Sequence, residues 1–291
     1  MSHDCFLRVL QKQPPDTATL WHEAKQYVTL TKGCLVLDDT TLDKPYAKKM
    51  PLVTWHWSGT HRRGVQGINL QTLLWTDGTA CGPCACAVYD KPLGGRTKNE
   101  AFAAMLRTAK TRGFQPAYVL FDSWYSSLAN LKLIRQLGWQ WLTRFKKNRQ
   151  VNPDRTGNRP IEQVAIPPEG RVVHLRGYGL IKVFRIEAKK GRVEYWATSN
   201  LALSPAQRAT LAHHGWQIET YHRGLKQCCG VDRAQVRSVR GQLNHILLAI
   251  RAFLRLEGVR LRTGQSWYET KAQIVRQAIG QAIRDPTSRG C

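Results

Sequence analysis

The chain has 291 residues, 42% of them hydrophobic and 9% aromatic, which is enough to bury a substantial core in one large domain, with or without an insertion. Its 44 Lys and Arg against 20 Asp and Glu give a formal net charge of +24. A globular chain tolerates such a charge most readily beside a polyanion, so the leading partner is nucleic acid. No run of 18 apolar residues and no secretory leader is visible, and we expect a cytoplasmic, nucleoid-associated protein without a membrane partner.

The first half of the chain predicts a mixed α/β order. Two short helices, separated by Pro14-Pro15, precede a buried strand over 34–37 that ends in Asp38-Asp39. A polar loop and then a hairpin follow that strand. Hydrophobic periodicity next predicts a helix over 99–111, a strand over 118–121 that stops at Asp122, a helix over 128–137 and a strand over 139–145 that runs into a basic segment.

The second half begins with short alternating segments and ends in helices. The alternation predicts strands over 172–175, 181–186 and 193–197, separated by turns that contain glycine. Ser204-Pro205 is a typical helix start, and the helical pattern continues through Lys226. Two further helices are predicted near 243–256 and 268–283. The sequence therefore indicates a β-rich insertion before a helical C-terminal part.

Acidic residues follow two of the predicted strands. Asp38 and Asp39 end the first strand, and Asp122 ends the strand over 118–121. Neighbouring strand ends in an open α/β sheet would bring these carboxylates together. Glu219 lies on the helix after Pro205, where its three- and four-residue spacing places it on one face with three other polar or aromatic residues: Trp216, Arg223 and Lys226.

This residue set suits phosphodiester chemistry, because carboxylate oxygens hold Mg²⁺ and paired metal ions stabilise both the attacking and the leaving oxygen. The spacing alone also permits a structural interpretation, since Asp-Asp-Thr is a common helix cap and Asp122-Ser123 a common turn start. The eight cysteines suggest no metal site, because Cys81-x-x-Cys84 is followed by no second pair at zinc-site spacing.

Several ordered motifs carry a resemblance to a known family. They are Leu-Asp-Asp-Thr at 37–40, Leu-Phe-Asp-Ser-Trp-Tyr at 120–125, and Trp-Gln-Ile-Glu at 216–219 continuing through Tyr-His-Arg to Lys-Gln at 226–227. The chain resembles the DDE transposases of bacterial insertion sequences, in the branch with a Tyr-Arg-Glu-Lys signature. The resemblance runs from about residue 5 to about residue 257.

The resemblance implies a ribonuclease-H-like mixed sheet flanked by helices, with the β-rich insertion before the last catalytic helix. It implies metal-dependent cleavage at element ends and strand transfer into target DNA, with two Mg²⁺ or Mn²⁺ ions. The implied catalytic and metal-binding residues are Asp39, Asp122 and Glu219, with Asp38 as the less favoured alternative to Asp39. The expected DNA contacts are Lys226, Arg223, Trp216, His222, Arg144 and Lys146.

We expect double-stranded DNA as the partner, both the element's terminal inverted repeats and the target, bound by a homodimer. The expected organisation starts with a short helical N-terminal segment over 1–32, which could represent a truncated DNA-binding region. The first part of the ribonuclease-H-like core spans 33–150. The β-strand insertion then spans 151–203, the catalytic-domain helices span 204–258, and a C-terminal helix and tail span 259–291.

Two alternatives remain at this point. The signature Tyr and Arg should lie seven and four residues before Glu219, but Ala212 and Gly215 occupy those positions. This departure motivates the alternative of an inactive transposase relic that only binds DNA. The same metal site without a visible end-recognition domain motivates the other, a hydrolytic DNA nuclease without strand transfer.

Overall fold

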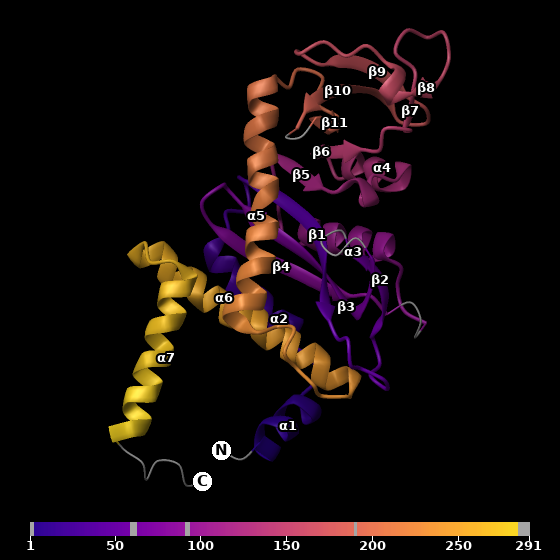
Figure 1. The fold of residues 1–291 in the computed structure, drawn as a ribbon. Helices are drawn as coiled ribbons and strands as arrows, with labels where there is room; N and C mark the ends of the chain where they lie inside the picture. The colour runs from indigo at the N-terminus through magenta and orange to yellow at the C-terminus, as the bar shows by residue number, and fades with distance from the viewer. Residues whose placement is uncertain (1–2, 59–62, 91–93, 189–190, 285–291) are drawn as a thin grey trace.

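The computed structural model describes residues 3–58, 63–90, 94–188 and 191–284 (Figure 1). Its helices are α1 (His3–Lys12), α2 (Thr17–Ala24), α3 (Lys98–Thr111), α4 (Leu128–Gln136), α5 (Pro205–Cys229), α6 (Val239–Thr263) and α7 (Trp267–Arg284). Its strands are β1 (Cys34–Asp43), β2 (Thr54–Ser58), β3 (Arg63–Thr76), β4 (Cys81–Val88), β5 (Tyr118–Phe121), β6 (Gln140–Phe145), β7 (Gln150–Val151), β8 (Arg159–Pro160), β9 (Arg171–Leu175), β10 (Gly179–Glu187) and β11 (Val193–Thr198). In the described ranges, no helix combines the length and apolar character needed to cross a membrane.

Nine strands of the described chain form one mixed sheet. Its order is β2-β3-β1-β5-β6-β11-β10-β9, and β4 pairs with β3 as well. β1 runs antiparallel to β3 but parallel to β5, which is parallel to β6. β11 pairs antiparallel with β6, so the inserted strands β9 to β11 continue the same sheet instead of forming a separate one. The predicted mixed α/β class with flanking helices is confirmed.

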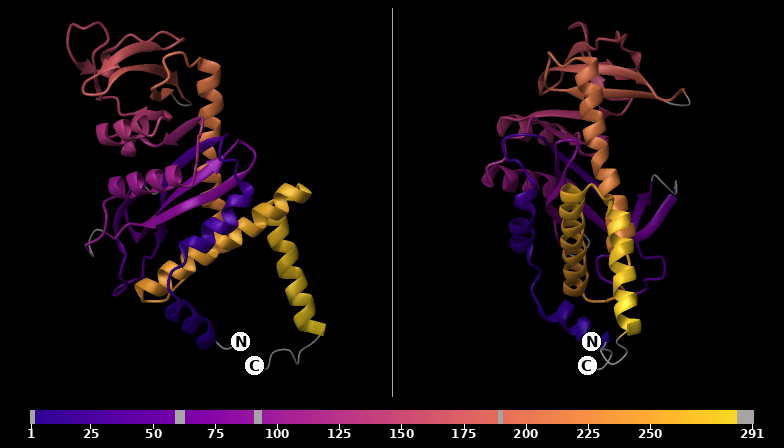
Figure 2. Two further views of the ribbon diagram at one scale, coloured as in Figure 1. Left: turned by 180° about the vertical axis from the view of Figure 1, so that it is seen from behind. Right: turned by 90° about the vertical axis from the view of Figure 1, so that its left-hand side faces the viewer.

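Helices cover both faces of this sheet because its central strands carry apolar side chains on both faces. Leu37 of β1 packs in one cluster with Phe102 of α3 and Ile134 of α4. Val36, one residue earlier, packs in the opposite cluster with Tyr221 of α5. Figure 2 shows α3 and α4 on one side of the sheet and α5 and α6 on the other.

β1 is longer than the strand predicted over Cys34–Leu37. Its parallel pairing with β5 ends where Leu37 faces Phe121, but its antiparallel pairing with β3 continues until Asp43 faces Gly67. β-Branched Thr40 and Thr41 favour this extended conformation. Asp38 and Asp39 therefore lie inside a strand, on opposite faces of the sheet, and not in a loop beyond it.

Two other segments differ from the prediction. The polar loop after the first strand contains β2, which pairs with the start of β3 through Thr54 opposite Gly67. α6 is longer at both ends than the predicted 243–256, because the Ser238 side chain caps its start and Gly264, at φ 77°, ends it in a left-handed conformation.

α5 connects the inserted strands to the rest of the fold. It begins with a capping box between Ser204 and Gln207, followed by Pro205, and ends at Gly230 in the left-handed conformation. These signals support an uninterrupted helix of 25 residues, which crosses the sheet from the insertion to α6 in Figure 1. Glu219 lies near its middle, on a helix that packs against β1 and β5.

Candidate active site

Two strands and one helix converge on a single cleft. β1 and β5 stop pairing after Leu37 and Phe121, and the next residue in the chain is an aspartate in both cases. Asp38 and Asp122 line a cleft of about 250 Å³, together with Glu219 from α5. The structure thus brings together three acidic residues that lie up to 181 positions apart (from 38 to 219) in the chain.

Asp39 lies on the other face of the sheet, away from these three carboxylates. Its carboxylate accepts hydrogen bonds from the Lys98 ammonium (2.9 Å), the Tyr125 hydroxyl (2.7 Å) and the Asn69 amide. Asp39 does not line the cleft. Adjacent residues of a strand point to opposite faces of the sheet, so the carboxylates of Asp38 and Asp39 lie on opposite faces.

The two aspartates have opposite electrostatic environments. Burial, followed by the negative charges of Asp39, Glu219 and Asp122, raises the pKa of Asp38 well above its ordinary value. For Asp39, burial favours the neutral form, but the charge and hydrogen bond of Lys98 and the other two donors outweigh it and lower the pKa. Asp39 is thus a satisfied anion, whereas burial and the neighbouring carboxylates both disfavour the charged form of Asp38.

Asp39 also supports the turn that presents Asp122. The Tyr125 hydroxyl is bonded to Asp39, and the Tyr125 backbone N–H donates to the carbonyl of Asp122 at 3.0 Å. Gln71 of β3 donates to the same hydroxyl at 3.0 Å. Tyr125 is buried, and its hydroxyl takes part in two hydrogen bonds. It therefore fixes the short helical turn after β5 and the position of Asp122 at the cleft.

The inserted strands contribute the opposite wall of the cleft. Arg144, at the end of β6, lies 3.2 Å from the Asp122 carboxylate and 3.5 Å from that of Glu194 on β11. Its guanidinium is 5.8 Å from the centre of the Trp196 ring, and Arg208 of α5 is 5.6 Å from that ring. The insertion thus places an aromatic ring between two arginines beside the carboxylates.

Comparison with known families decides the assignment of the chain. The family model described as the transposase DDE domain matches residues 29–255. The chain belongs to the DDE transposase family. The membership in the DDE transposases that the ordered acidic motifs predicted is thereby confirmed.

A solved structure shows the same fold as this transposase-family chain. It is the cryo-EM structure of piggyBac transposase in a synaptic complex with hairpin DNA, with a TM-score of 0.56 and 12% sequence identity. The similarity covers 99% of this chain but only 65% of the piggyBac chain, so this chain spans about two thirds of the length of that protein. It confirms the predicted ribonuclease-H-like fold. No curated protein matches the chain.

The residues predicted to contact DNA lie in different places. Trp216, 57% exposed, and Arg144 line the cleft. Arg223 and Lys146 are exposed outside it. Lys226 donates to the backbone carbonyl of Thr41 at 2.8 Å, which holds its ammonium against β1.

His222 is buried, with 4% of its surface exposed, and presents no surface to DNA. Burial lowers its pKa to about 3, so the folded state keeps a neutral imidazole that the unfolded state would protonate near its ordinary value of 6.5. Stability should therefore fall as the pH falls from 6.5 toward 3. Between pH 7 and pH 5 this histidine should account for a loss of about 2 kcal/mol.

Urea unfolding of wild type and His222→Gln at pH 7 and pH 5 measures this contribution. The variant should lose less stability between the two pH values, whatever its absolute stability. His174→Gln, at an exposed position on β9, is the control and should keep the wild-type pH dependence. If the stability of wild type and of His222→Gln depended equally on pH, the lowered pKa of His222 would be contradicted.

The sequence interpretation missed two arginines: Arg192, which lines the cleft, and Arg208, which lies beside the cleft-lining Trp196. Arg208 precedes Ala212 by one helical turn, and Ala212, Trp216 and Glu219 all line the cleft, so the spacing already used for Glu219 could have included Arg208. Arg192 comes from the end of the insertion next to β11 and has no such local signal. Ala212 and Gly215, at the signature positions, also line the cleft. Cationic groups at this cleft come mainly from the insertion and β6.

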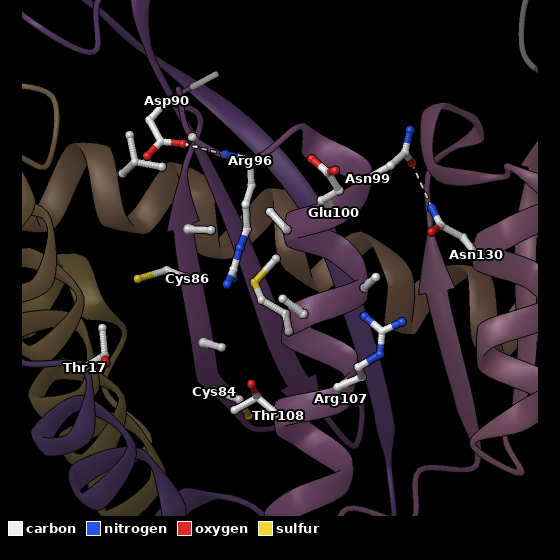
Figure 3. Close-up of a pocket in the computed structure, with 18 of the residues that line it drawn as sticks. Thr17, Cys84, Cys86, Asp90, Arg96, Asn99, Glu100, Arg107, Thr108 and Asn130 are labelled. Carbon is white, nitrogen blue, oxygen red and sulfur yellow. Dashed lines mark hydrogen bonds between the residues drawn. The ribbon is translucent and has the colours of Figure 1, made fainter. Parts of the chain in front are cut away.

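A larger hollow of about 1340 Å³ lies between β4 and α3 (Figure 3). Its polar groups already bond one another: Asn130 donates to Asn99 at 2.8 Å, and Asp90 accepts the backbone N–H of Arg96 at 3.1 Å. Burial raises the pKa of Cys84 to about 12, which keeps that thiol protonated and unreactive near neutral pH. This hollow lacks the convergent acids that the smaller cleft provides.

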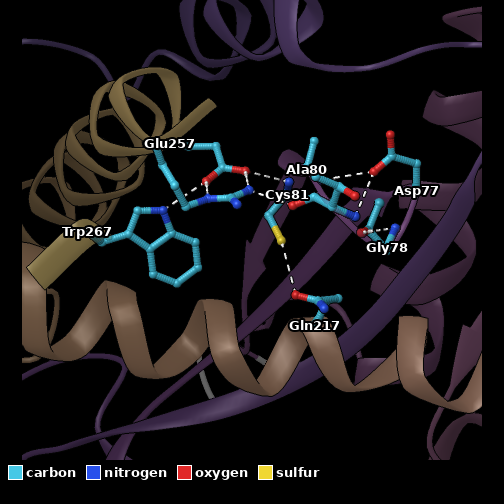
Figure 4. A network of polar contacts seen from close by, with 10 residues as sticks. Asp77, Gly78, Ala80, Cys81, Gln217, Glu257 and Trp267 are labelled. Atoms are coloured by element: carbon cyan, nitrogen blue, oxygen red, sulfur yellow. Dashed lines mark hydrogen bonds and ion pairs between the residues drawn. The ribbon is translucent and has the colours of Figure 1, made fainter. Parts of the chain in front are cut away.

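A buried network joins α6, α7 and β4 and also contacts α5 (Figure 4). The Glu257 carboxylate, fully buried on α6, accepts the backbone N–H of Cys81 (2.7 Å), two N–H groups of Arg260 (both 2.7 Å) and the Trp267 indole N–H (2.8 Å). The Cys81 thiol contacts the Gln217 side chain at 3.7 Å. Gln217 lies two residues before Glu219, so the network supports the helix that carries the third carboxylate.

The donor chemistry of the cleft fits a hard divalent cation. Carboxylate oxygens are the ligands that Mg²⁺ and Mn²⁺ prefer, and Asp38 lies in the field of three other carboxylates. Over the described residues, no group of three His, Cys, Asp or Glu side chains lies close enough together to hold a metal ion. Arg144 provides a positive charge beside Asp122.

Proposed function

We propose that this transposase cleaves DNA at the ends of a mobile element and joins the freed ends to target DNA. The observation that carries the proposal is the meeting of Asp38, Asp122 and Glu219 in one cleft of a DDE-family fold. Asp38 takes the place expected for Asp39, because the direction of each side chain from β1 puts only Asp38 beside the other two acids.

These three carboxylates would hold Mg²⁺ or Mn²⁺, up to two ions. When bound, the metal supplies Lewis-acid stabilisation of the attacking and leaving oxygens of a phosphodiester. The side chains of the chain itself bind and orient the DNA. Arg144 and Arg192 supply positive charge for phosphate oxygens, and Trp216 supplies an exposed ring at the cleft.

The proposed reaction consists of two consecutive phosphoryl transfers. In the first, the oxygen of a water molecule bonds to phosphorus, the bond from phosphorus to the 3′-oxygen breaks, and the strand is released with a 3′-hydroxyl. In the second, this 3′-oxygen bonds to a target phosphorus and displaces a target 3′-oxygen, which takes up a proton. No covalent protein intermediate is needed, and none of the three acids acts as a nucleophile.

The partner that this function requires is double-stranded DNA, as terminal inverted repeats and as target. The formal charge of +24 favours that partner. The known DNA complex of piggyBac transposase supports it by analogy of fold. A homodimer that joins two element ends stays a prediction.

The test is cleavage of labelled DNA that carries the element's flanking inverted repeats, with Mg²⁺ or Mn²⁺ against EDTA. Wild type should nick the repeat boundary only with metal, and Glu219→Gln should not, although it still binds the duplex. Glu169→Gln, at an exposed position in the insertion, is the matched control and should cleave like wild type. Binding without nicking by wild type would favour an inactive DNA-binding relic, and nicking without joined products would favour a hydrolytic nuclease.

A further inference from the structure

A second hollow, of about 770 Å³, lies where the segment after β1 meets the segment after α5. We call it the basic groove and define it by its four exposed cations: Lys48, Lys49, Arg233 and Arg237. Two acids, Asp43 and Asp232, also line it. Its two walls are separated by more than 180 residues of sequence, so the groove exists only in the folded chain.

The walls of the basic groove are fixed to each other. Lys44, only 8% exposed, donates from its ammonium to the backbone carbonyls of Asp232 (2.6 Å) and Ala234. Gln242 of α6 donates to the carbonyl of Val236 at 2.6 Å and lies 3.3 Å from the sulfur of Met50. Lys44 therefore acts as an internal brace between the two segments, and the groove is preformed.

The exposed cations of the groove face solvent. The ion pairs between described residues include none of the four. Tyr46, with 93% of its surface exposed, lies in the same wall as Lys48 and Lys49. Four exposed cations that form no ion pair with another described residue surround a braced hollow, with an aromatic hydroxyl beside them. These are the kinds of side chain that contact sugar and phosphate in nucleic-acid complexes.

The position of the groove relates it to the cleft. Asp38 lines the cleft and Asp43 lines the groove, and the two lie five positions apart along β1, a span of about 17 Å. Lys226 lies between, bonded to the Thr41 carbonyl of the same strand. Because phosphates of one DNA strand follow each other every 3.4 Å or so along the axis, the span corresponds to about five nucleotides.

We propose that the basic groove binds the phosphate backbone of duplex DNA about five nucleotides from the phosphate in the cleft. The assignment rests on the proposed function for its distance from the cut, but the binding itself needs no catalysis. The groove would hold the duplex in register while the cleft acts on it, because backbone contacts set the position of a protein along DNA.

The test is the salt dependence of duplex binding in EDTA, measured by fluorescence anisotropy with full-length protein and a short duplex between about 50 and 200 mM KCl. The variants are Lys48→Gln/Lys49→Gln and Arg233→Gln/Arg237→Gln. If each pair contacts two phosphates, the slope of log K against log salt should become shallower by about 1.8 in each. The matched control is Arg107→Gln/Lys132→Gln on α3 and α4, across the sheet, which should keep the wild-type slope.

Thermal unfolding of all variants checks folding, and the substitutions at the four exposed groove positions should leave it unchanged. Wild-type slopes in both groove variants, or an equal loss in the control, would overturn the proposal. A loss confined to single-stranded oligonucleotide would overturn the duplex assignment. These outcomes distinguish the proposed reaction from the proposed groove. Shallower slopes in the groove variants, with no cleavage by wild type, would refute only the reaction. Cleavage by wild type, with unchanged slopes in the groove variants, would refute only the binding of DNA by the groove.

Discussion

Asp38→Asn should lower the rate of metal-dependent DNA cleavage by about 10³-fold or more, whereas Asp39→Asn should leave most of it. Asp38 shares the cleft with Asp122 and Glu219, and losing the transition-state stabilisation of a bound metal costs several kcal/mol. Asp39 lies on the other face of the sheet. The asparagine in Asp39→Asn keeps an acceptor for the Tyr125 hydroxyl but loses the charge that pairs with Lys98. Its main effect should be a loss of about 1–3 kcal/mol in folding stability.

Initial nicking rates and urea unfolding of both variants distinguish these effects, with assays at a temperature where both proteins are folded. Duplex binding in EDTA should survive in Asp38→Asn, which separates lost chemistry from lost binding. The reverse result, in which Asp39→Asn abolishes cleavage in a stable protein and Asp38→Asn cleaves normally, would return the first metal ligand to Asp39.

Glu257→Gln should destabilise the fold by about 3–5 kcal/mol, one of the largest losses expected from a single conservative change. The substitution removes the charge that compensates Arg260 and turns an amide donor toward the N–H groups of Cys81, Arg260 and Trp267. The melting temperature should fall on the order of 10 °C. Differential scanning calorimetry measures the change.

The control is the exposed pair of Arg185 and Glu187, which lie 2.8 Å apart on β10. Glu187→Gln should change stability by less than about 1 kcal/mol, because solvent screens an exposed ion pair. Similar losses in the two variants would show that the Glu257 network does not join α6, α7 and β4 as its contacts indicate.

Local signals in the sequence were sufficient for the elements that carry the acids. The strand over 118–121 and the helix start at Ser204-Pro205 are where periodicity and capping predict them, because apolar alternation and cap residues act over a few positions. Helical spacing placed Trp216 and Glu219 on a common face, and both line the cleft. The basic composition and the ordered acidic motifs were by themselves enough to indicate the transposase family.

Tertiary structure alone decided which of two adjacent aspartates faces the cleft. That choice depends on the pairing of β1 with β3 and β5, since a shift of one residue reverses every side chain on a strand. Long-range pairing also brought Arg192 and Trp196 to the carboxylates, by joining β11 to β6. The basic groove likewise arises only where Lys44 bonds to carbonyls of the segment after α5. Residue order sets local conformation, but contacts between distant segments depend on how whole elements pack, and no local pattern contains that information.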